Sequence, residues 1–165
     1  MEPQVVAMEG ILKDELAVFE GLYSLEEEKT GAIMNHDGKL LEKISREQEG
    51  LISKIQALET GRIRRMTDYK RARHIKETIT LKDMADQIAG RGGSRLMTIS
   101  GNLKAVINRL NNLQKTNRTL INDNMEYYTI LLKGLKDNRI MDSGYSPDGK
   151  EEETLKQSIL FNQTA

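Results

Sequence analysis

A long run of mostly apolar residues at alternating steps of three and four dominates the second half of the sequence. The run continues over residues 94–137 and comprises Leu96, Ile99, Leu103, Val106, Leu110, Leu113, Asn117, Leu120, Asn124, Tyr127 and Leu131. This spacing places the side chains on one narrow stripe of a helix that faces a partner helix. The pattern therefore predicts an all-α fold in which residues 94–137 form one long helix packed against others.

Two further helices are predicted upstream, over residues 5–34 and 39–76. The first carries a stripe at Val5, Met8, Leu12, Leu16 (or Glu15), Phe19 and Leu22, which fades at Glu26 and Lys29 and resumes at Ile33. The second carries a seam with the same spacing at Leu41, Ile44, Gln48, Leu51, Ile55 and Leu58. The turn-forming residues 35–38 separate the two helices, and so short a connection predicts an antiparallel hairpin.

The segment between this hairpin and the long helix predicts a short helix over residues 80–89. Thr80 followed by Asp83 resembles a capping box, in which a side chain at the helix start and one three residues later satisfy each other's backbone N–H groups. We expect residues 90–93, with three glycines, to stop this helix and Ser94 to cap the next one.

Two polar residues, Asn117 and Asn124, occupy the stripe of the long helix. An asparagine on such a seam commonly fixes register and partner number at some cost in stability. Alternatively, this polar stretch faces a protein partner. The sequence leaves both interpretations open.

The last residues, 138–165, differ in composition from the helices. Residues 142–149 are rich in turn formers, and a charge run, Glu151-Glu152-Glu153, follows them. A short amphipathic patch then comprises Leu155, Ile159, Leu160 and Phe161. Such a patch cannot offset its own ordering entropy in water, so we predict a flexible tail with a short amphipathic helix that folds against a partner. The predicted architecture is an elongated antiparallel helical bundle, or coiled-coil hairpin, over 1–137 with this tail behind it.

Composition argues against several classes of function. Lys plus Arg and Asp plus Glu are 25 each, there is no Cys, and the N-terminus lacks a basic region followed by an apolar run. The apolar runs are too short to cross a bilayer. The two histidines, His36 and His74, have no second histidine at helical spacing, so we expect no metal site. We therefore predict a cytoplasmic protein that is not an enzyme, inserts in no membrane, and uses no cofactor or small-molecule substrate.

Residues 61–76, the basic stretch, carry seven basic side chains and one acidic side chain. They could neutralise several phosphates of a nucleic acid. Tyr69 is the only aromatic among them, however, and on a helix these residues point in several directions. A solvated helix surface and a docking surface for an acidic protein are the other interpretations, and we do not expect nucleic acid binding.

Several short motifs occur in order along the chain. They are a turn with Asp37-Gly38, the helix end Ile55-Gln56-Ala57-Leu58-Glu59 before an arginine-rich stretch, Thr80-Leu81, Leu110-Asn111-Asn112-Leu113 with Asn117 and Leu120-Ile121, and Tyr145-Ser146-Pro147-Asp148-Gly149. Together they resemble the FlgN family of flagellar type III export chaperones, and the resemblance covers almost the whole chain. The sequence departs from that pattern at Glu47-Gln48-Glu49, where a Lys is expected.

The resemblance implies a helical chaperone that binds the C-terminal helices of hook-associated junction proteins and keeps them from assembling before export. A helix-in-groove complex would cover the apolar faces that those helices use in the filament. We place the client-binding contact at Asn117, Leu120, Asn124, Tyr127, Tyr128, Leu131, Leu135, Tyr145, Ile159 and Leu160. The alternative is that the helical members of this set form the hairpin core. Export-apparatus proteins are further candidate partners.

Two other functions fit the pattern. In a structural coiled-coil homo-oligomer, the stripe over 94–137 would be buried between copies of the chain. In a helical nucleic-acid-binding module, binding would fall steeply with salt and would depend on Arg64, Arg65, Arg71 and Arg73. Light scattering and a salt titration distinguish these functions from that of a chaperone.

Overall fold

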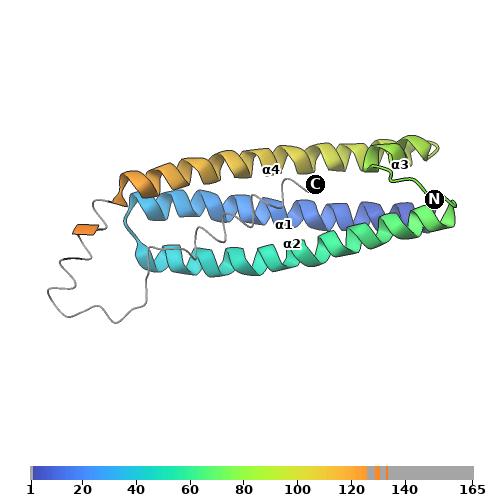
Figure 1. The fold of residues 1–165 in the computed structure, drawn as a ribbon. Helices are drawn as coiled ribbons and strands as arrows, with labels where there is room; N and C mark the ends of the chain where they lie inside the picture. Colours follow the sequence, from blue (N-terminus) through green and yellow to red (C-terminus); the bar gives the residue numbers. More distant parts are fainter. Residues whose placement is uncertain (1, 126–128, 131–132, 134–165) are drawn as a thin grey trace. The chain divides into compact units, whose positions relative to one another are not determined.

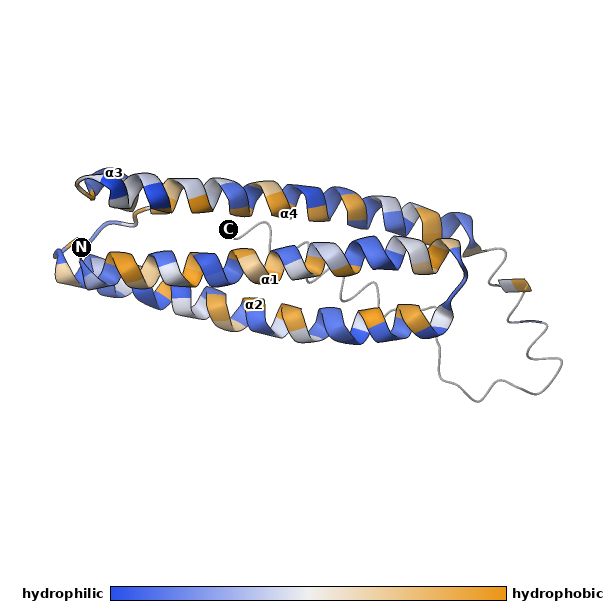
Figure 2. Cartoon of the chain, turned by 180° about the vertical axis from the view of Figure 1, so that it is seen from behind, coloured by the Kyte–Doolittle hydropathy of each residue, from blue (hydrophilic) through white to orange (hydrophobic). Residues whose placement is uncertain are grey.

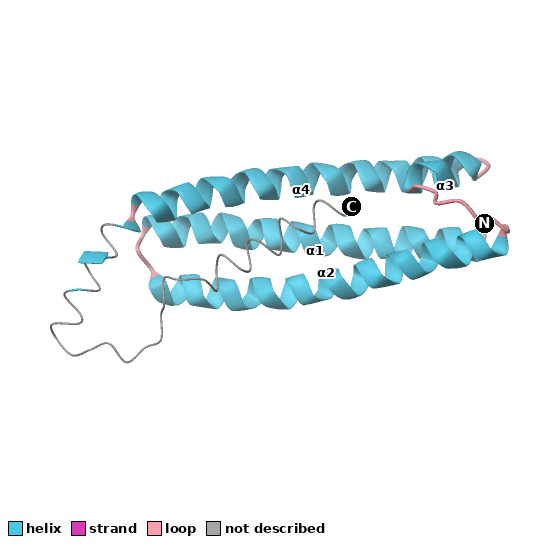
Figure 3. Ribbon diagram, in the orientation of Figure 1, coloured by secondary structure: helices cyan, strands magenta, loops and turns pink. Residues whose placement is uncertain are grey.

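Four α-helices form the part of the chain that the structure, a computed structural model, describes, namely residues 2–125, 129, 130 and 133 (Figure 1). Their bounds are Pro3–Met34 for α1, Gly38–Ala72 for α2, Leu81–Gln87 for α3 and Arg91–Asp123 for α4. Within these residues there is no β-strand (Figure 3). The predicted all-α fold is therefore confirmed.

The chain folds into two compact units. Among the described residues, unit 1 comprises 2–24 and 50–110, and unit 2 comprises 25–49, 111–125, 129, 130 and 133. The helices α1, α2 and α4 each contribute one segment to unit 1 and another to unit 2, while α3 belongs to unit 1 alone. Apolar and polar residues alternate along these three long helices (Figure 2), as the spacing of three and four requires.

The helix α1 ends at a turn that also starts α2. The N–H of Asp37 donates to the carbonyl oxygen of Ala32 at 2.9 Å, and the N–H of His36 donates to the carbonyl oxygen of Ile33 at 3.2 Å. These two bonds form a Schellman motif, and His36 takes the left-handed conformation that the motif requires, with φ of 53°. Asp37 then caps α2, because its Oδ1 accepts a 3.0 Å hydrogen bond from the N–H of Leu40.

The end of α2 repeats this arrangement four residues earlier than its predicted end at residue 76. The N–H of Ile75 donates to the carbonyl oxygen of Lys70 at 2.9 Å, and the N–H of His74 donates to the carbonyl oxygen of Arg71 at 3.2 Å. His74 has φ of 57° and occupies the left-handed position. Both histidines of the sequence thus lie at the left-handed positions that terminate helices, a role that could not be predicted from their residue type.

The start of α3 matches its prediction. Thr80 Oγ1 accepts a hydrogen bond from the N–H of Asp83 at 3.1 Å, and the Asp83 carboxylate accepts one from the N–H of Thr80 at 2.7 Å. This capping box confirms the sequence reading. The backbone N–H of Thr80 is the main cause that holds the pKa of Asp83 below its usual value.

The start of α4 differs from its prediction, since the helix begins at Arg91 and Ser94 lies inside it. The predicted cap at Ser94 is therefore wrong. Gly90, with φ of 76°, makes the turn alone. Gly93 lies so close to α3 that a Cβ atom there would be 2.2 Å from the carbonyl oxygen of Ala85. Gly90 thus provides the turn between α3 and α4, as expected, whereas Gly93 lies within α4 and permits close packing of α3 on α4.

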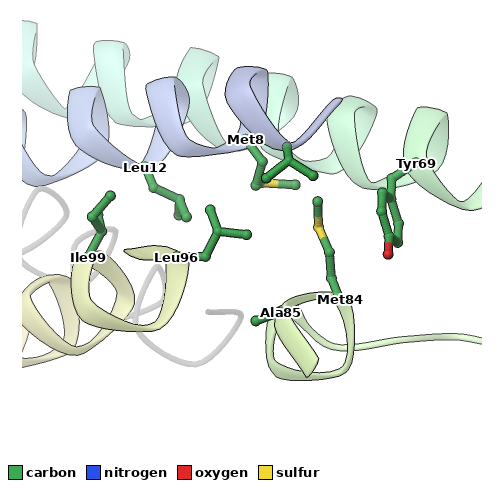
Figure 4. Packing of buried hydrophobic residues seen from close by; sticks show 8 residues of the cluster. Met8, Leu12, Tyr69, Met84, Ala85, Leu96 and Ile99 are labelled. Atoms are coloured by element: carbon green, nitrogen blue, oxygen red, sulfur yellow. The ribbon is translucent and has the colours of Figure 1, made fainter. Parts of the chain in front are cut away.

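The core of unit 1 joins all four helices (Figure 4). Its buried cluster comprises Val5, Met8, Leu12, Tyr69, Met84, Ala85, Leu96 and Ile99. Figure 4 shows Met8 and Leu12 of α1 facing Leu96 of α4 and Met84 of α3. Full burial of such a side chain contributes about 1.5–3 kcal/mol, so burial of this cluster stabilises unit 1.

Contacts within unit 1 give the directions of its helices. Glu2 pairs with Arg73 and Glu15 pairs with Arg62, so α1 and α2 are antiparallel, as predicted. Glu9 pairs with Arg95 at 3.3 Å, and the ring of Tyr23 lies 5.2 Å from the Arg109 guanidinium carbon, so α4 is parallel to α1. The segment that contains α3 returns the chain to the start of α1, which makes this parallel arrangement possible.

None of the helices in the described ranges combines the length and the apolar character that a bilayer-crossing helix needs.

Candidate functional site

The two units differ in what they bury. Among the described residues, unit 1 buries one polar side chain, Glu15, with fifteen apolar ones: Val5, Met8, Leu12, Phe19, Leu22, Ile52, Ile55, Tyr69, Met84, Ala85, Leu96, Ile99, Val106, Ile107 and Leu110. Unit 2 buries five apolar residues, Leu25, Ala32, Ile33, Leu41 and Ile44, and five polar ones, Glu26, Lys29, Gln48, Gln114 and Asn117. Unit 2 is thus the unit with an unusual core, and we examine it as the candidate site.

A hydrogen-bonded polar layer crosses the core of unit 2. Its members are Glu26 and Thr30 of α1, Gln48 of α2 and Asn117 of α4. The Glu26 carboxyl group accepts bonds from Gln48 Nε2 at 2.7 Å and from Asn117 Nδ2 at 2.9 Å. Asn117 Nδ2 also donates to the Glu26 carbonyl oxygen at 3.0 Å, and Asn117 Oδ1 accepts from Thr30 Oγ1 at 2.7 Å. The polar layer therefore joins three helices through donors and acceptors that suit one another.

This arrangement follows from positions on the helical stripes. Gln48 and Asn117 occupy seam positions, so their helices direct them inward. Glu26 continues the stripe of α1 four residues after Leu22, at the point where apolar residues give way to polar ones. A buried polar group without a partner costs about 1–3 kcal/mol, so the three helices are tied to one relative register.

Asn117 is 1% exposed, and its side chain contacts the chain's own α1. This placement agrees with the interpretation of a seam asparagine that fixes register. Its predicted contact with a client remains a prediction, and it would require α4 to leave α1 and α2 in unit 2.

Two other predicted client-binding residues are described, and both are half-buried. Leu120 lies on the stripe, and Asn124 donates its side-chain amide to the Leu120 carbonyl oxygen at 2.7 Å. The remaining predicted residues lie outside the described ranges, namely Tyr127, Tyr128, Leu131, Leu135, Tyr145, Ile159 and Leu160. Their roles stay predictions.

Unit 2 also leaves apolar side chains partly or fully accessible. Ile121 and Met125 are half-buried on and after α4, and Leu113 is half-buried one turn before Asn117. Met34 at the end of α1 is 60% exposed, and Ile130 is 64% exposed. Such residues provide apolar surface that a second polypeptide can cover.

Sequence reasoning did not assign a role to Glu26 or Thr30. The available signal was the fading of the α1 stripe at Glu26 and Lys29, which keep the steps of four and three between Leu22 and Ile33. Polar residues at stripe positions mark a buried polar layer as well as a break in the stripe. Here they mark the layer, since Glu26 is 0% exposed.

The basic stretch lies in unit 1, and several of its cations are bound by the chain itself. Arg62 pairs with Glu15 at 3.2 Å and with Glu59 at 4.0 Å. Arg73 pairs with Glu2, and its guanidinium carbon lies 4.9 Å from the ring centre of Tyr69. These contacts leave a smaller positive surface than the sequence suggested, which weakens the nucleic-acid alternative.

Glu15 is the one charged residue in the apolar core of unit 1 among those described. Burial raises the pKa of this carboxyl group, and the neighbouring Arg62 guanidinium partly offsets the effect. Because Glu15 is buried and Leu16 is only half-buried, the stripe of α1 passes through Glu15 and not through Leu16, the other option at this step.

In the described ranges, no cluster of three or more His, Cys, Asp or Glu side chains could hold a metal ion.

Residues 1–153 match the model of one protein family, described as FlgN protein. The chain belongs to the FlgN family. FlgN proteins are flagellar export chaperones, and this FlgN chain has that general role. No curated protein and no solved structure matches it. The match extends over all four helices and therefore includes residues of both units.

Proposed function

We propose that this FlgN chain binds the C-terminal helices of flagellar hook–filament junction proteins in the cytoplasm and prevents their premature assembly before type III secretion. It acts by binding and carries out no reaction. The family match supports the chaperone role, and the choice of client rests on the kind of surface that unit 2 offers.

The observation that carries this proposal is the incompletely buried apolar stripe at the end of α4. Leu120, Ile121 and Met125 are half-buried, and Ile130 is exposed. Upstream on the same helix, Leu96, Val106 and Leu110 are buried. Among the described residues, the apolar side chains at and after the end of α4 are thus less buried than those upstream, as expected of a helix that also packs against another protein.

The mechanism is competition for apolar faces. A client helix that packs on this stripe cannot use the same face to join a filament, and it becomes available again when the complex separates. The predicted contacts Tyr127, Tyr128, Leu131, Leu135, Tyr145, Ile159 and Leu160 extend the same stripe and its tail, and they remain part of the proposal.

The test is a titration of the chain with a C-terminal fragment of a hook–filament junction protein, followed by calorimetry. Leu120→Ala should weaken binding by about tenfold or more, which corresponds to about 1.4 kcal/mol. Leu103→Ala is the matched control, because Leu103 is a half-buried leucine of α4 in unit 1. Equal affinities of the two variants, or absence of binding by the unchanged chain, would contradict the proposal.

Light scattering of the unchanged chain tests the structural alternative in the same experiment. A tight oligomer that binds no fragment would favour a structural coiled coil.

A further inference from the structure

The segment of α4 in unit 2, residues 111–123, is held differently from the segment in unit 1. In unit 1, α4 buries Leu96, Ile99, Val106, Ile107 and Leu110. In unit 2, its buried residues are Gln114 and Asn117, while Leu113, Leu120 and Ile121 are half-buried. The buried side chains of α4 thus change from apolar in unit 1 to polar in unit 2.

A second observation shows that the packing of residues 111–123 leaves a polar group unsatisfied. The Nε atom of Arg118 is buried, and among the described residues it has no hydrogen-bond partner. A buried donor without an acceptor loses its bond to water and gains none in return, which destabilises the arrangement that buries it.

These contacts make opening of unit 2 inexpensive relative to unit 1. When α4 leaves, the polar side chains exchange protein partners for water, whereas buried apolar side chains would gain nothing from water. Segments with few buried apolar contacts are the ones that open locally in native proteins. Residues 111–123 therefore form the part of α4 that separates most readily from α1 and α2.

We propose that a client helix binds unit 2 by taking the place of residues 111–123 on α1 and α2, and that it carries an Asn or Gln on its apolar seam to occupy the position of Asn117. The proposal rests on the proposed chaperone function and names the surface and the client chemistry. The hairpin residues buried in unit 2 include Leu25, Glu26, Ile33, Leu41, Ile44 and Gln48, and among them Glu26 is bonded directly to Asn117.

The Glu26 carboxyl group supplies the selectivity. Gln48 Nε2 bonds to its Oε2, and Asn117 Nδ2 bonds to its Oε1. A client helix with an amide at the matching position restores the second bond. A client with only apolar residues leaves Oε1 buried without that donor, so it is rejected.

Opening is measured first, in the whole chain without a client. The sequence has no Cys, so single cysteines report local exposure through their rate of thiol labelling. Ile44→Cys probes unit 2, and Ile55→Cys is the matched control in unit 1, since both isoleucines are buried on α2. We expect Ile44→Cys to be labelled at least about tenfold faster. Equal rates at equal thermal stability would overturn the proposal.

Replacement of α4 is tested by holding the helix in place. Thr30→Cys and Asn117→Cys, joined by a short bismaleimide, fix α4 to α1 in unit 2, where the two side chains are in contact. Glu9→Cys and Arg95→Cys, joined in the same way, fix the same two helices in unit 1. The junction-protein fragment should lose at least about tenfold in affinity on cross-linking in unit 2 and be unaffected by cross-linking in unit 1. Unchanged binding to the chain cross-linked in unit 2 would overturn the proposal while the chaperone function stands.

The client chemistry is tested by a double-mutant cycle. Seam Asn and Gln residues of the fragment are replaced one at a time with Leu, and each fragment is titrated against the unchanged chain and against Glu26→Leu. One replacement should weaken binding to the unchanged chain by about tenfold and have little effect with Glu26→Leu. If every replacement has the same effect on both chains, the amide requirement is wrong. If no fragment binds at all, the proposed function fails, and the labelling rates of Ile44→Cys and Ile55→Cys still decide whether unit 2 opens.

Discussion

The side-chain nitrogen of Asn117 donates to both the carbonyl oxygen and the carboxyl group of Glu26, at distances of 3.0 and 2.9 Å. One residue of α4 thus holds the main chain and the side chain of one residue of α1. Because both bonds are buried, their geometry fixes α4 along α1 as well as around it in unit 2.

Replacing Asn117 with leucine should lower the free energy of unfolding by about 1–3 kcal/mol, because Glu26 loses a buried donor. Replacing Glu26, Gln48 and Asn117 together with leucine should recover most of this loss, since an apolar layer leaves fewer groups unsatisfied. Urea denaturation followed by circular dichroism measures both. Asn112→Leu, at an exposed position of α4, is the control and should change little. A single Asn117→Leu variant as stable as the unchanged chain would falsify the assigned role of the polar layer.

His74→Gly should stabilise the chain by about 1 kcal/mol. His74 has φ of 57°, a conformation that costs a residue with a Cβ atom about 1–2 kcal/mol and costs glycine little. His74→Ala keeps that cost, so it is the control and should bring no gain. The midpoints of thermal unfolding compare the three chains. A glycine variant that melts below the alanine variant would show that the His74 side chain contributes more than its backbone position.

Gly93→Ala should destabilise unit 1, whereas Gly101→Ala in the same helix should stabilise it. A Cβ atom at Gly93 would meet the Ala85 carbonyl oxygen at 2.2 Å, and one at Gly101 would meet nothing within 4 Å. Overpacking costs about 1–3 kcal/mol, and an open helical glycine replaced by alanine gains about 1 kcal/mol. Urea denaturation checks the opposite signs, and equal effects of the two substitutions would refute the close packing of α3 on α4.

Glu15 should give the stability of the chain a characteristic pH dependence. Its pKa is raised above the ordinary value of 4.5, chiefly by burial, so the folded state takes up a proton more readily than the unfolded state. Its contribution to stability is therefore fully present below 4.5 and is lost as the pH rises through the raised pKa. Glu15→Gln removes this dependence, so the difference between the two chains should change with pH in that window.

Glu9→Gln provides the opposite case. The pKa of Glu9 is lowered, first by its hydrogen bond from Lys13, so the stability it contributes is present above its ordinary pKa and is lost as the pH falls. Unfolding free energies measured across a pH series should show opposite trends for Glu9→Gln and Glu15→Gln. Parallel trends would mean that the raised pKa of Glu15 is assigned wrongly.

Periodicity alone was enough to predict α1, α2 and α4, because long stripes at steps of three and four leave no other regular structure open. Local chemistry was enough for Thr80 and Asp83, whose bonds lie within one helical turn. The helix boundaries were less predictable: α4 ends at Asp123, well before its predicted end at 137, α3 ends at Gln87, and the start of α4 and the end of α2 also differ from the prediction. Gly93 lies within α4 and packs closely against Ala85 of α3, and α2 ends at Ala72, just before the left-handed His74.

The candidate site was less predictable than the fold. The seam position of Asn117 indicated a buried asparagine, but its partner Glu26 lies 91 residues away and no periodicity connects the two. The direction of α4 relative to α1 in unit 1 likewise depends on the path taken through residues 73–90, which the stripes do not encode. Most of the predicted client contacts lie beyond Met125, and they are still predictions from the sequence.

The spacing of the polar layer along the chain has a consequence for the order of events during synthesis. Gln48 is 22 residues from Glu26, whereas Asn117 is 91 residues from it. Contacts between nearby residues form sooner than distant ones, so we expect Glu26 and Gln48 to meet while α4 is still being made. Pulsed hydrogen exchange during refolding should accordingly protect α2 before α4 in unit 2. During synthesis, the α1–α2 hairpin of unit 2 would then be able to bind a client helix before residues 111–123 of α4 are present to occupy the same surface.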